Sequence, residues 1–160
     1  MFTLEQKVDL VMRYIASGGD AKEELKKAII DALVEDKTPE ERSIENEMAI
    51  IDILRKLGMP VHVLGYKYTI HAIRLCVNEP RYGLGITTRL YPEVAKKFGT
   101  TPQKVERGIR YAIESTFERC DWRDVEEIFG NTVSVLKGKP VNRQFIVYLA
   151  NYIRVKEANL

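Results

Sequence analysis

The sequence contains few of the residues on which metal binding, disulfide bonding and nucleophilic catalysis depend. Its 160 residues include two cysteines and two histidines. Cys76 and Cys120 are too few for a disulfide framework, so we expect buried free thiols rather than a disulfide or a metal pair. His62 and His71 have no cysteine or carboxylate at metal-site spacing, so we expect both to be packing or surface residues. These shortages predict neither a bound metal nor a cofactor.

Long apolar runs and catalytic motifs are also missing. No stretch approaches the about 20 apolar residues of a membrane-spanning helix, and the N-terminus lacks the basic start and apolar core of a signal peptide. No glycine-rich loop follows a strand, and no nucleophile elbow occurs. Paired carboxylates such as Glu40 and Glu41 lie at an expected helix start, where they compensate the helix dipole. We therefore expect a cytoplasmic protein that is not an enzyme and does not contact a membrane.

Basic and acidic residues are unevenly distributed along the chain. Positions 1–50 hold seven Lys and Arg against twelve Asp and Glu, which leaves 18 basic and 11 acidic residues for positions 51–160. The small overall net charge of +2 hides this difference. Neutralising phosphates supplies most of the non-specific affinity for nucleic acid, and this requires a basic surface. The second part of the chain is the one that we expect to contact a nucleic acid.

Capping signals and helical periodicity recur along the chain and predict an all-α, multi-helix fold. Capping-box patterns begin amphipathic helices at 3–6 and 20–23, and glycines at 18–19 end the first of them. A third helix begins at Thr38 and ends at Gly58. Further helices are expected at about 67–77, 84–91, 92–98, 102–118, 122–129 and 143–156, the last two capped by Asp121 and Asn142. Positions 61–64 have a strand-like composition but are too few for a sheet.

The stretch YPEVAKKFGTTPQKVERG, at positions 91–108, has the spacing of two helices that cross at a tight turn. Ala95 is small where the second helix would cross the first, and Val94 and Phe98 are the apolar residues of the inner face. Gly99 tolerates the positive φ that the corner needs. The sequence therefore predicts a helix-turn-helix, with helices at about 92–98 and 102–118.

The second of these helices has one apolar and one charged face. Thr101 stands at its N-cap and Pro102 at its first position. The residues expected to be buried recur at helical spacing: Val105, Ile109, Ala112, Ile113 and Thr116. The residues expected on the opposite face are Gln103, Arg107, Arg110 and Glu114, with Lys104 to one side and Glu106 nearer the apolar edge. Two arginines one turn apart suit guanine in the major groove, although a solvated charged face is the simpler alternative.

Three segments carry a resemblance to a known family. They are GMPVHVLGYKY (58–68), LYPEVAKKFGTTPQKVERGIRYAIE (90–114) and IFGNTVSVLKGKPVNRQFI (128–146). In content, order and spacing they resemble the C-terminal DNA-binding domain of stage-zero sporulation protein A, the response regulator that starts endospore formation. Three long collinear matches are far more specific than a helix-turn-helix pattern alone. The resemblance covers positions from about 51 to the C-terminus.

The resemblance implies roles for individual residues. The family's recognition motif, of the type SRVERAIRH, falls on positions 103–111. The residues implied to contact bases are Gln103, Glu106, Arg107 and Arg110. The residues implied to lie near phosphates are Lys96, Lys97, Thr100, Thr101, Lys104 and Tyr111.

Four positions depart from the family's motif. Gln103 replaces a serine, Tyr111 replaces a histidine, and Lys104 replaces an arginine, which keeps the charge but loses the planar two-pronged donor. Specificity is therefore expected to have shifted from the family's box, TGNCGAA, while the docking mode stays. Gly108 replaces an alanine and is expected to weaken the helix by up to about 1 kcal/mol.

The N-terminal part departs from the family. A receiver domain of the family's kind does not fit into the helical positions 1–43, so we expect these to be an extension before a DNA-binding domain at 44–160, without control by aspartyl phosphorylation. Short amphipathic helices are marginal alone. The extension is expected to pack against the domain or to form a homodimer; dimers on tandem DNA sites are a further expectation.

Two functions are consistent with these observations. The first is a sequence-specific, nucleoid-associated transcriptional regulator that binds double-stranded DNA. The second is a helical protein-interaction module that dimerises with, or titrates, a full-length regulator of the family. Retention of Arg107 and Arg110 favours the first, because a domain freed from DNA binding has no physical need for exposed arginines there.

Overall fold

The computed structural model describes residues 3–17, 25–27, 29, 38–130 and 138–158 of the chain. Within these ranges the regular structure is helical and no strand occurs, so the predicted all-α class is confirmed. The chain divides into two compact units, Met1–Arg42 and Ser43–Leu160. None of the described helices is long and apolar enough to cross a membrane.

The first unit contains helix α1, Leu4–Ala16. Its predicted capping box is confirmed: the backbone N–H of Gln6 donates to Thr3 Oγ1 at 3.2 Å, and the N–H of Thr3 donates to Gln6 Oε1 at 2.8 Å. Its apolar side chains Val8, Met12 and Ile15 are exposed. The predicted glycine stop at 18–19 and the second capping box at 20–23 lie outside the described residues.

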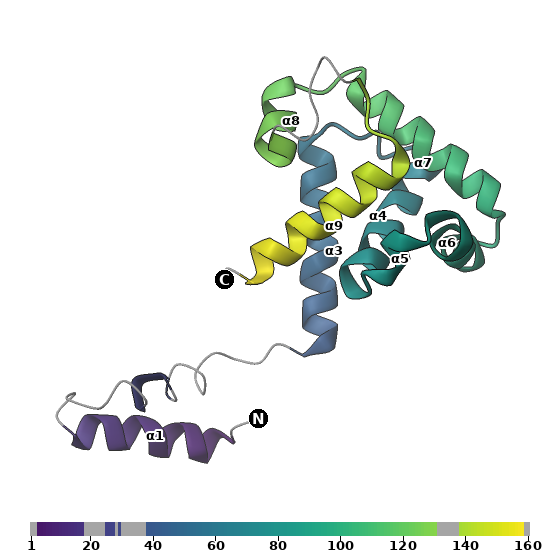
Figure 1. Ribbon diagram of the computed structural model, residues 1–160. Coiled ribbons are helices and arrows are strands. Elements are labelled where there is room, and N and C mark those ends of the chain that lie inside the picture. The colour runs from purple at the N-terminus through teal and green to yellow at the C-terminus, as the bar shows by residue number, and fades with distance from the viewer. Residues whose placement is uncertain (1–2, 18–24, 28, 30–37, 131–137, 159–160) are drawn as a thin grey trace. The chain divides into compact units, whose positions relative to one another are not determined.

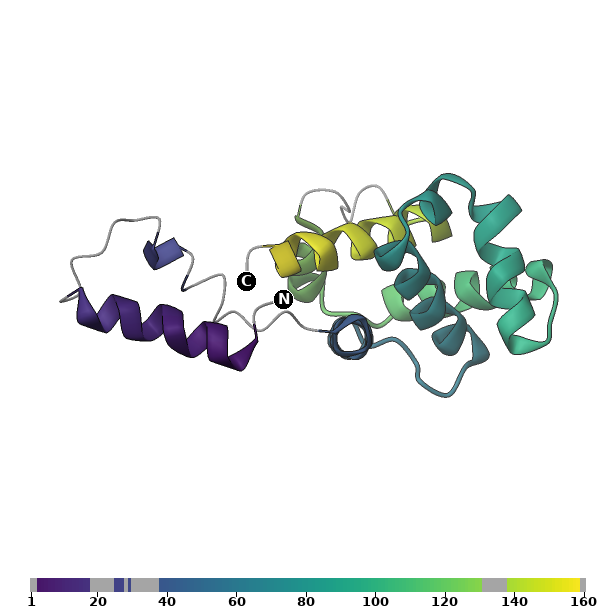
Figure 2. The same ribbon diagram turned by 90° about the horizontal axis from the view of Figure 1, so that it is seen from below.

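Helix α3, Pro39–Lys56, begins and ends where its sequence signals predict. Thr38 N–H donates to Glu41 Oε2 at 2.8 Å, and Glu41 N–H donates to Thr38 Oγ1 at 3.2 Å. Gly58, with φ of 75°, follows the end of the helix. Figure 2 looks down the axis of α3, which packs Ile50 and Leu54 into the core of the second unit.

The rest of the second unit consists of short and medium helices (Figure 1). They are α4 (Leu64–Asn78), α5 (Arg81–Leu84), the π-helical turn η1 (Ile86–Leu90), α6 (Tyr91–Phe98), α7 (Pro102–Phe117), α8 (Trp122–Phe129) and α9 (Asn142–Ala158). Two expectations need correction. The helix expected at 67–77 begins at Leu64, within the strand-like stretch. The helix expected at 84–91 is instead the last residue of α5, the turn η1 and the first residue of α6. Leu90 N–H donates to the Gly85 carbonyl at 3.1 Å, which is the wider spacing of a π-helical turn.

Helix α4 lies at the centre of this unit and packs against both α7 and α9. It meets α7 at two glycines. A Cβ built on Gly65 would lie 1.9 Å from the carbonyl oxygen of Gly108, and one on Gly108 would lie 3.0 Å from the Tyr68 ring. Gly65 is therefore required by the close approach of the α7 backbone, whereas a side chain at position 108 would require the Tyr68 ring to shift slightly.

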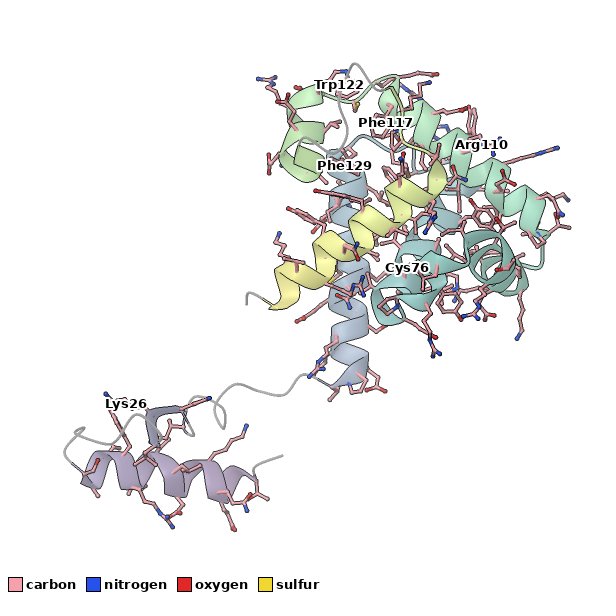
Figure 3. All side chains as sticks on the ribbon, viewed as in Figure 1. Lys26, Cys76, Arg110, Phe117, Trp122 and Phe129 are labelled. Carbon is pink, nitrogen blue, oxygen red and sulfur yellow. The ribbon has the colours of Figure 1, made fainter. Side chains whose placement is uncertain are left out.

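Aromatic rings fill the core where α7, α8 and α9 meet. Phe117 of α7 lies 6.1 Å from Trp122 and 6.3 Å from both Phe129 and Phe145, measured between ring centroids. Figure 3 shows Phe117, Trp122 and Phe129 at this end of the unit, with Arg110 further along α7. Phe117 thus anchors the C-terminal end of α7 in the core.

Both cysteines are free thiols, and the prediction that they are buried is confirmed for Cys76 only. Cys76 is buried in α4, and burial raises the pKa of its thiol to about 11. Cys120 is half-buried after α7, and burial also raises its pKa. Neither thiol has the lowered pKa of a reactive cysteine.

Candidate nucleic-acid interface

The corner between α6 and α7 has the predicted geometry. Gly99 has φ of 60° and ψ of 41°, which is the left-handed conformation that ends helices. The Thr100 N–H donates to the Ala95 carbonyl at 3.0 Å, and so closes α6. Thr101 then caps α7, because its Oγ1 accepts from Lys104 N–H at 3.3 Å, and Pro102 is the first helical residue. The corner is therefore fixed by local backbone chemistry.

The inner faces of both helices are buried as predicted. On α7 the buried residues are Val105, Ile109, Ala112, Ile113 and Thr116. On α6, Val94 and Ala95 are buried and Phe98 is half-buried. The Phe98 ring makes edge contacts with Tyr68 and His71 of α4, at centroid distances of 5.1 and 5.8 Å. Both helices of the pair are thus seated on α4.

The candidate DNA-contacting residues lie on the outer side. Gln103, Arg107 and Arg110 are exposed, and Glu106 is half-buried at the edge. Among the candidate phosphate contacts, Lys96, Lys97, Thr101, Lys104 and Tyr111 are exposed, and Thr100 is half-buried. Thr101 already uses its hydroxyl oxygen in the cap. Arg107 has no ion pair among the described residues, so its guanidinium is available to a ligand.

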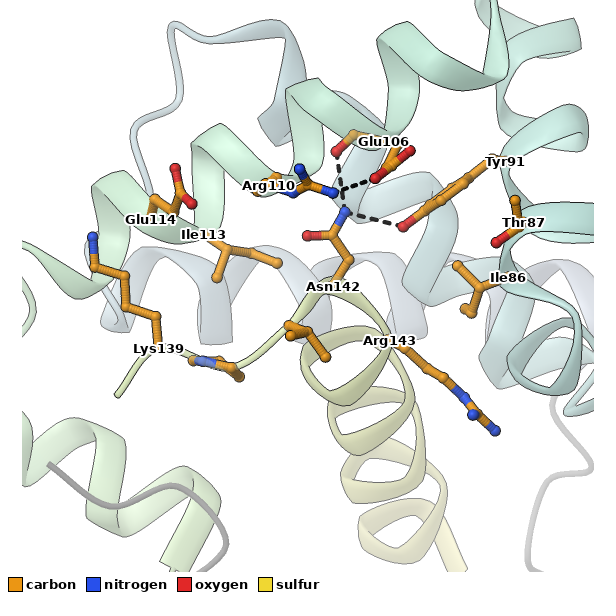
Figure 4. A pocket seen from close by; sticks show the side chains of 12 residues that line it. Ile86, Thr87, Tyr91, Glu106, Arg110, Ile113, Glu114, Lys139, Asn142 and Arg143 are labelled. Atoms are coloured by element: carbon orange, nitrogen blue, oxygen red, sulfur yellow. Dashed lines mark hydrogen bonds and ion pairs between the residues drawn. The ribbon is translucent and has the colours of Figure 1, made fainter. Parts of the chain in front are cut away.

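Arg110, unlike Arg107, has an ion-pair partner on α7. The Glu106 carboxylate forms an ion pair with the Arg110 guanidinium, one turn further along α7 (Figure 4). An exposed pair at this spacing contributes only about 0.3–0.5 kcal/mol. Its main effect is therefore to restrict the directions in which the Arg110 guanidinium points.

Asn142 connects this site to the last helix, and its predicted role as an N-cap is wrong. Helix α9 begins at Asn142 itself, and its side-chain Nδ2 donates to the Tyr91 hydroxyl and to the Glu106 carbonyl, each at 3.0 Å (Figure 4). The residue is 8% exposed. The backbone N–H of Val141, just before α9, donates instead to Gln144 Oε1 at 3.2 Å. Asn142 thus joins the starts of α6, α7 and α9.

The sequence does not reveal the contacts of Asn142 with Tyr91 and Glu106, because an asparagine near a helix start is ordinarily explained as the N-cap residue. The glutamine at position 144, three residues after Val141, is the signal that points to Val141 as the cap position. The Tyr91 hydroxyl is also affected by its surroundings. Burial raises its pKa, and the hydrogen bond from Asn142 opposes that shift.

His71 is a packing residue on the α4 side of the corner, one of the two roles predicted for it. Its Nδ1 lies 3.0 Å from Arg74 Nη2, and Arg74 pairs with Glu47 at 2.7 Å. Burial, followed by the charges of Arg74 and Lys97, lowers the pKa of His71 to about 4. The imidazole is therefore neutral near pH 7 and accepts a hydrogen bond from Arg74.

A comparison with known protein families supports this interface. The model of the family described as sporulation initiation factor Spo0A C terminal matches residues 50–153. The match extends over well more than half of the chain and includes α6, α7 and Asn142. It agrees with the resemblance carried by the three sequence segments.

Proposed function

Because the chain belongs to the family of the Spo0A C-terminal domain, a DNA-binding domain of a sporulation regulator, we propose that it is a sequence-specific transcriptional regulator that binds double-stranded DNA. The observation that carries the proposal is the outer face of α7. Arg107 and Arg110 lie there one turn apart, on a helix whose other face is anchored in the core. We assign DNA binding to positions 44–160 and regard 1–43 as an extension.

The residues of α7 have distinct proposed roles. Arg107 and Arg110 each donate two hydrogen bonds to O6 and N7 of a guanine. Glu106 orients Arg110 and accepts from a cytosine amino group, and Gln103 reads a further base near the start of the helix. Side chains near the N-terminus of a recognition helix are those that reach base edges in this type of domain.

Phosphate contacts are proposed for the residues around the corner. Lys96 and Lys97 occupy the last turn of α6, and Lys104 and Tyr111 flank the base-reading residues on α7. Thr100 and Thr101 lie in the corner between them. These contacts fix the register of the protein on the duplex and carry no sequence information themselves.

The proposal is tested by fluorescence anisotropy on a short duplex carrying TGTCGAA and on a scrambled duplex. The salt concentration is varied from about 50 to 200 mM, over which phosphate-driven binding falls steeply. A preference for the box that survives the higher salt is the expected result. Equal and steeply salt-sensitive binding to both duplexes would contradict specific recognition of this box, as would no binding. Selection from random duplexes then identifies any operator shifted by the changes at positions 103, 104 and 111.

A second function, protein interaction, is supported by α1. Its apolar residues Val8, Met12 and Ile15 are 54%, 61% and 65% exposed. Such a face suits a homodimer through α1, or a complex with a full-length regulator of the family. Size-exclusion chromatography of the wild type and of Met12→Asp tests this. The interaction function predicts an assembly that the aspartate abolishes, with negligible DNA affinity at physiological salt.

A further inference from the structure

An open hollow of about 460 Å³ lies between α7 and the start of α9 (Figure 4). Among the residues that line it are Arg110 and Glu114 of α7, Thr87 of η1, Lys139 before α9, and Arg143 in the first turn of α9. None of the residues from η1 or α9 belongs to the helix-turn-helix. The hollow adjoins the face that we propose for base reading, because Arg110 belongs to both.

The cations of this hollow differ in how far they are already neutralised. Arg110 pairs with Glu106. Lys139 Nζ pairs with Glu118 Oε1 at 2.9 Å, and its hydrogen bond lowers the pKa of that carboxyl group. Arg143 is exposed and has no ion pair among the described residues. Arg143 is therefore the cation of the hollow that is most available to an anion.

The opposing charge in the hollow is small. Two carboxylates line it, of which Glu106 is engaged with Arg110, and Glu114 lies one turn further along α7. Against them stand Arg110, Lys139 and Arg143, so the lining has a net positive charge. An anionic ligand is favoured at the end of the hollow near Arg143, away from Glu114.

The position of the hollow along α6 suggests which anion this is. The hollow includes Tyr91, the first residue of α6, whereas Lys96 and Lys97 lie in its last turn. An eight-residue helix spans about 12 Å at 1.5 Å per residue. That length is comparable to the width of the DNA major groove, about 12 Å. The hollow, which Tyr91 lines at the start of α6, and the lysines of the last turn are therefore separated by a length that suits the two strands bordering one groove.

We propose that Arg143 binds a phosphodiester of the DNA strand bordering the groove on the α9 side of α7, and that Lys139, which lies on the Glu114 side of the hollow (Figure 4), adds a weaker contribution through its charge. The inference rests on the proposed DNA binding and adds a contact surface outside the helix-turn-helix. Lys139 contributes less than Arg143, because Glu118 competes with the phosphate for its ammonium group. Arg143 acts without regard to sequence and so increases specific and non-specific affinity alike.

The test compares Arg143→Ala with Arg55→Ala in the full chain. Arg55 is an exposed arginine of α3 that pairs with Asp52 at 3.7 Å, so both variants lose one positive surface charge, although only Arg55 is paired. Anisotropy on the preferred and the scrambled duplex is measured at several salt concentrations, and thermal melting verifies that each variant is folded. For Arg143→Ala we expect about three- to tenfold weaker binding to both duplexes, and a slope of log K against log salt smaller by about one. Arg55→Ala should leave the slope unchanged.

A duplex series with single neutral methylphosphonate linkages locates the contact. Wild-type protein should lose affinity when the contacted linkage is neutralised, whereas Arg143→Ala should be insensitive to that substitution alone. Lys139→Ala should show a smaller loss than Arg143→Ala, and Glu118→Gln should strengthen binding by releasing Lys139.

The outcomes separate the inference from the function on which it rests. Wild-type protein that binds neither duplex overturns both. Wild-type protein that prefers one duplex, with Arg143→Ala equal to it in affinity and salt slope, overturns only the contact proposed here. Equal losses for Arg143→Ala and Arg55→Ala also overturn it, because they would reflect net charge alone.

Discussion

Helices α1 and α7 are built alike but differ in what covers their apolar faces. Both begin with a threonine cap, and both are strongly amphipathic. On α7, Val105 and Ile109 are 0% exposed, whereas on α1, Val8 and Ile15 are 54% and 65% exposed. Capping and periodicity form a helix in both cases, but only burial fixes its orientation. An anchored helix presents its polar face in one geometry, as base reading requires, whereas α1 presents an apolar face suited to a protein partner.

The sharpest test of this comparison replaces one isoleucine in each helix. Ile109→Ala should lower the free energy of unfolding by about 2–5 kcal/mol, because it leaves a cavity in the core. Ile15→Ala should change it by no more than about 0.5 kcal/mol, because the side chain is exposed. Urea unfolding of both variants measures this. Similar losses would show that α1 is anchored as firmly as α7.

The second prediction concerns the polar face of α7. Arg107→Ala should weaken binding to the preferred duplex by about 1–3 kcal/mol and binding to random DNA little. Lys97→Ala should weaken both, because it contacts phosphate. Fluorescence anisotropy measures the affinity of each of the two variants for each of the two duplexes. A loss of the same size on both duplexes for Arg107→Ala would remove its base-reading role.

A third prediction tests whether the anchoring of α7 depends on Asn142. Asn142→Ala removes two hydrogen bonds, and each contributes about 0.5–1.5 kcal/mol to stability. It should also reduce the preference for the specific duplex, because the start of α7 is less constrained. Asn151→Ala, an exposed change on the same helix, is the control. In a double-mutant cycle with Tyr91→Phe, additive effects on unfolding would show that the bond between Asn142 and Tyr91 contributes nothing.

The last prediction concerns the effect of pH on the packing behind the corner. The pKa of His71 falls from about 6.5 in the unfolded chain to about 4 in the native protein, where Arg74, Lys97 and Glu47 are the nearby charges. As pH falls through this interval the unfolded state takes up a proton that the native state does not, so stability decreases. His71→Gln should lack this contribution. Urea unfolding from pH 7 to 4 measures it, and parallel curves for the two proteins would contradict it.

The features that were predicted from sequence are those that neighbouring residues determine. The Thr3 capping box, the helix start at Thr38, the Gly99 corner and the Thr101 cap each depend on atoms a few residues apart. The buried face of α7 followed from periodicity, since one stripe of apolar residues must face the core.

The features that sequence reasoning missed depend on residues far apart in the chain. Asn142 binds Tyr91 and Glu106, and nothing near position 142 indicates those partners. Neither Gly65 nor Gly108 indicates from its neighbours in sequence that it has a packing partner. Only the structure shows that the two glycines face each other where α4 meets α7. The early start of α4 at Leu64 likewise overrides the strand-like composition of the preceding residues.

The most direct test of base reading is a loss-of-contact experiment. Each base pair of the preferred duplex is replaced in turn, and affinities are measured for the wild type and for Arg107→Ala. We predict at least one G·C pair whose replacement costs the wild type about 1–3 kcal/mol and costs Arg107→Ala almost nothing. If every replacement costs the two proteins the same, Arg107 does not read a base, and α7 does not act as proposed.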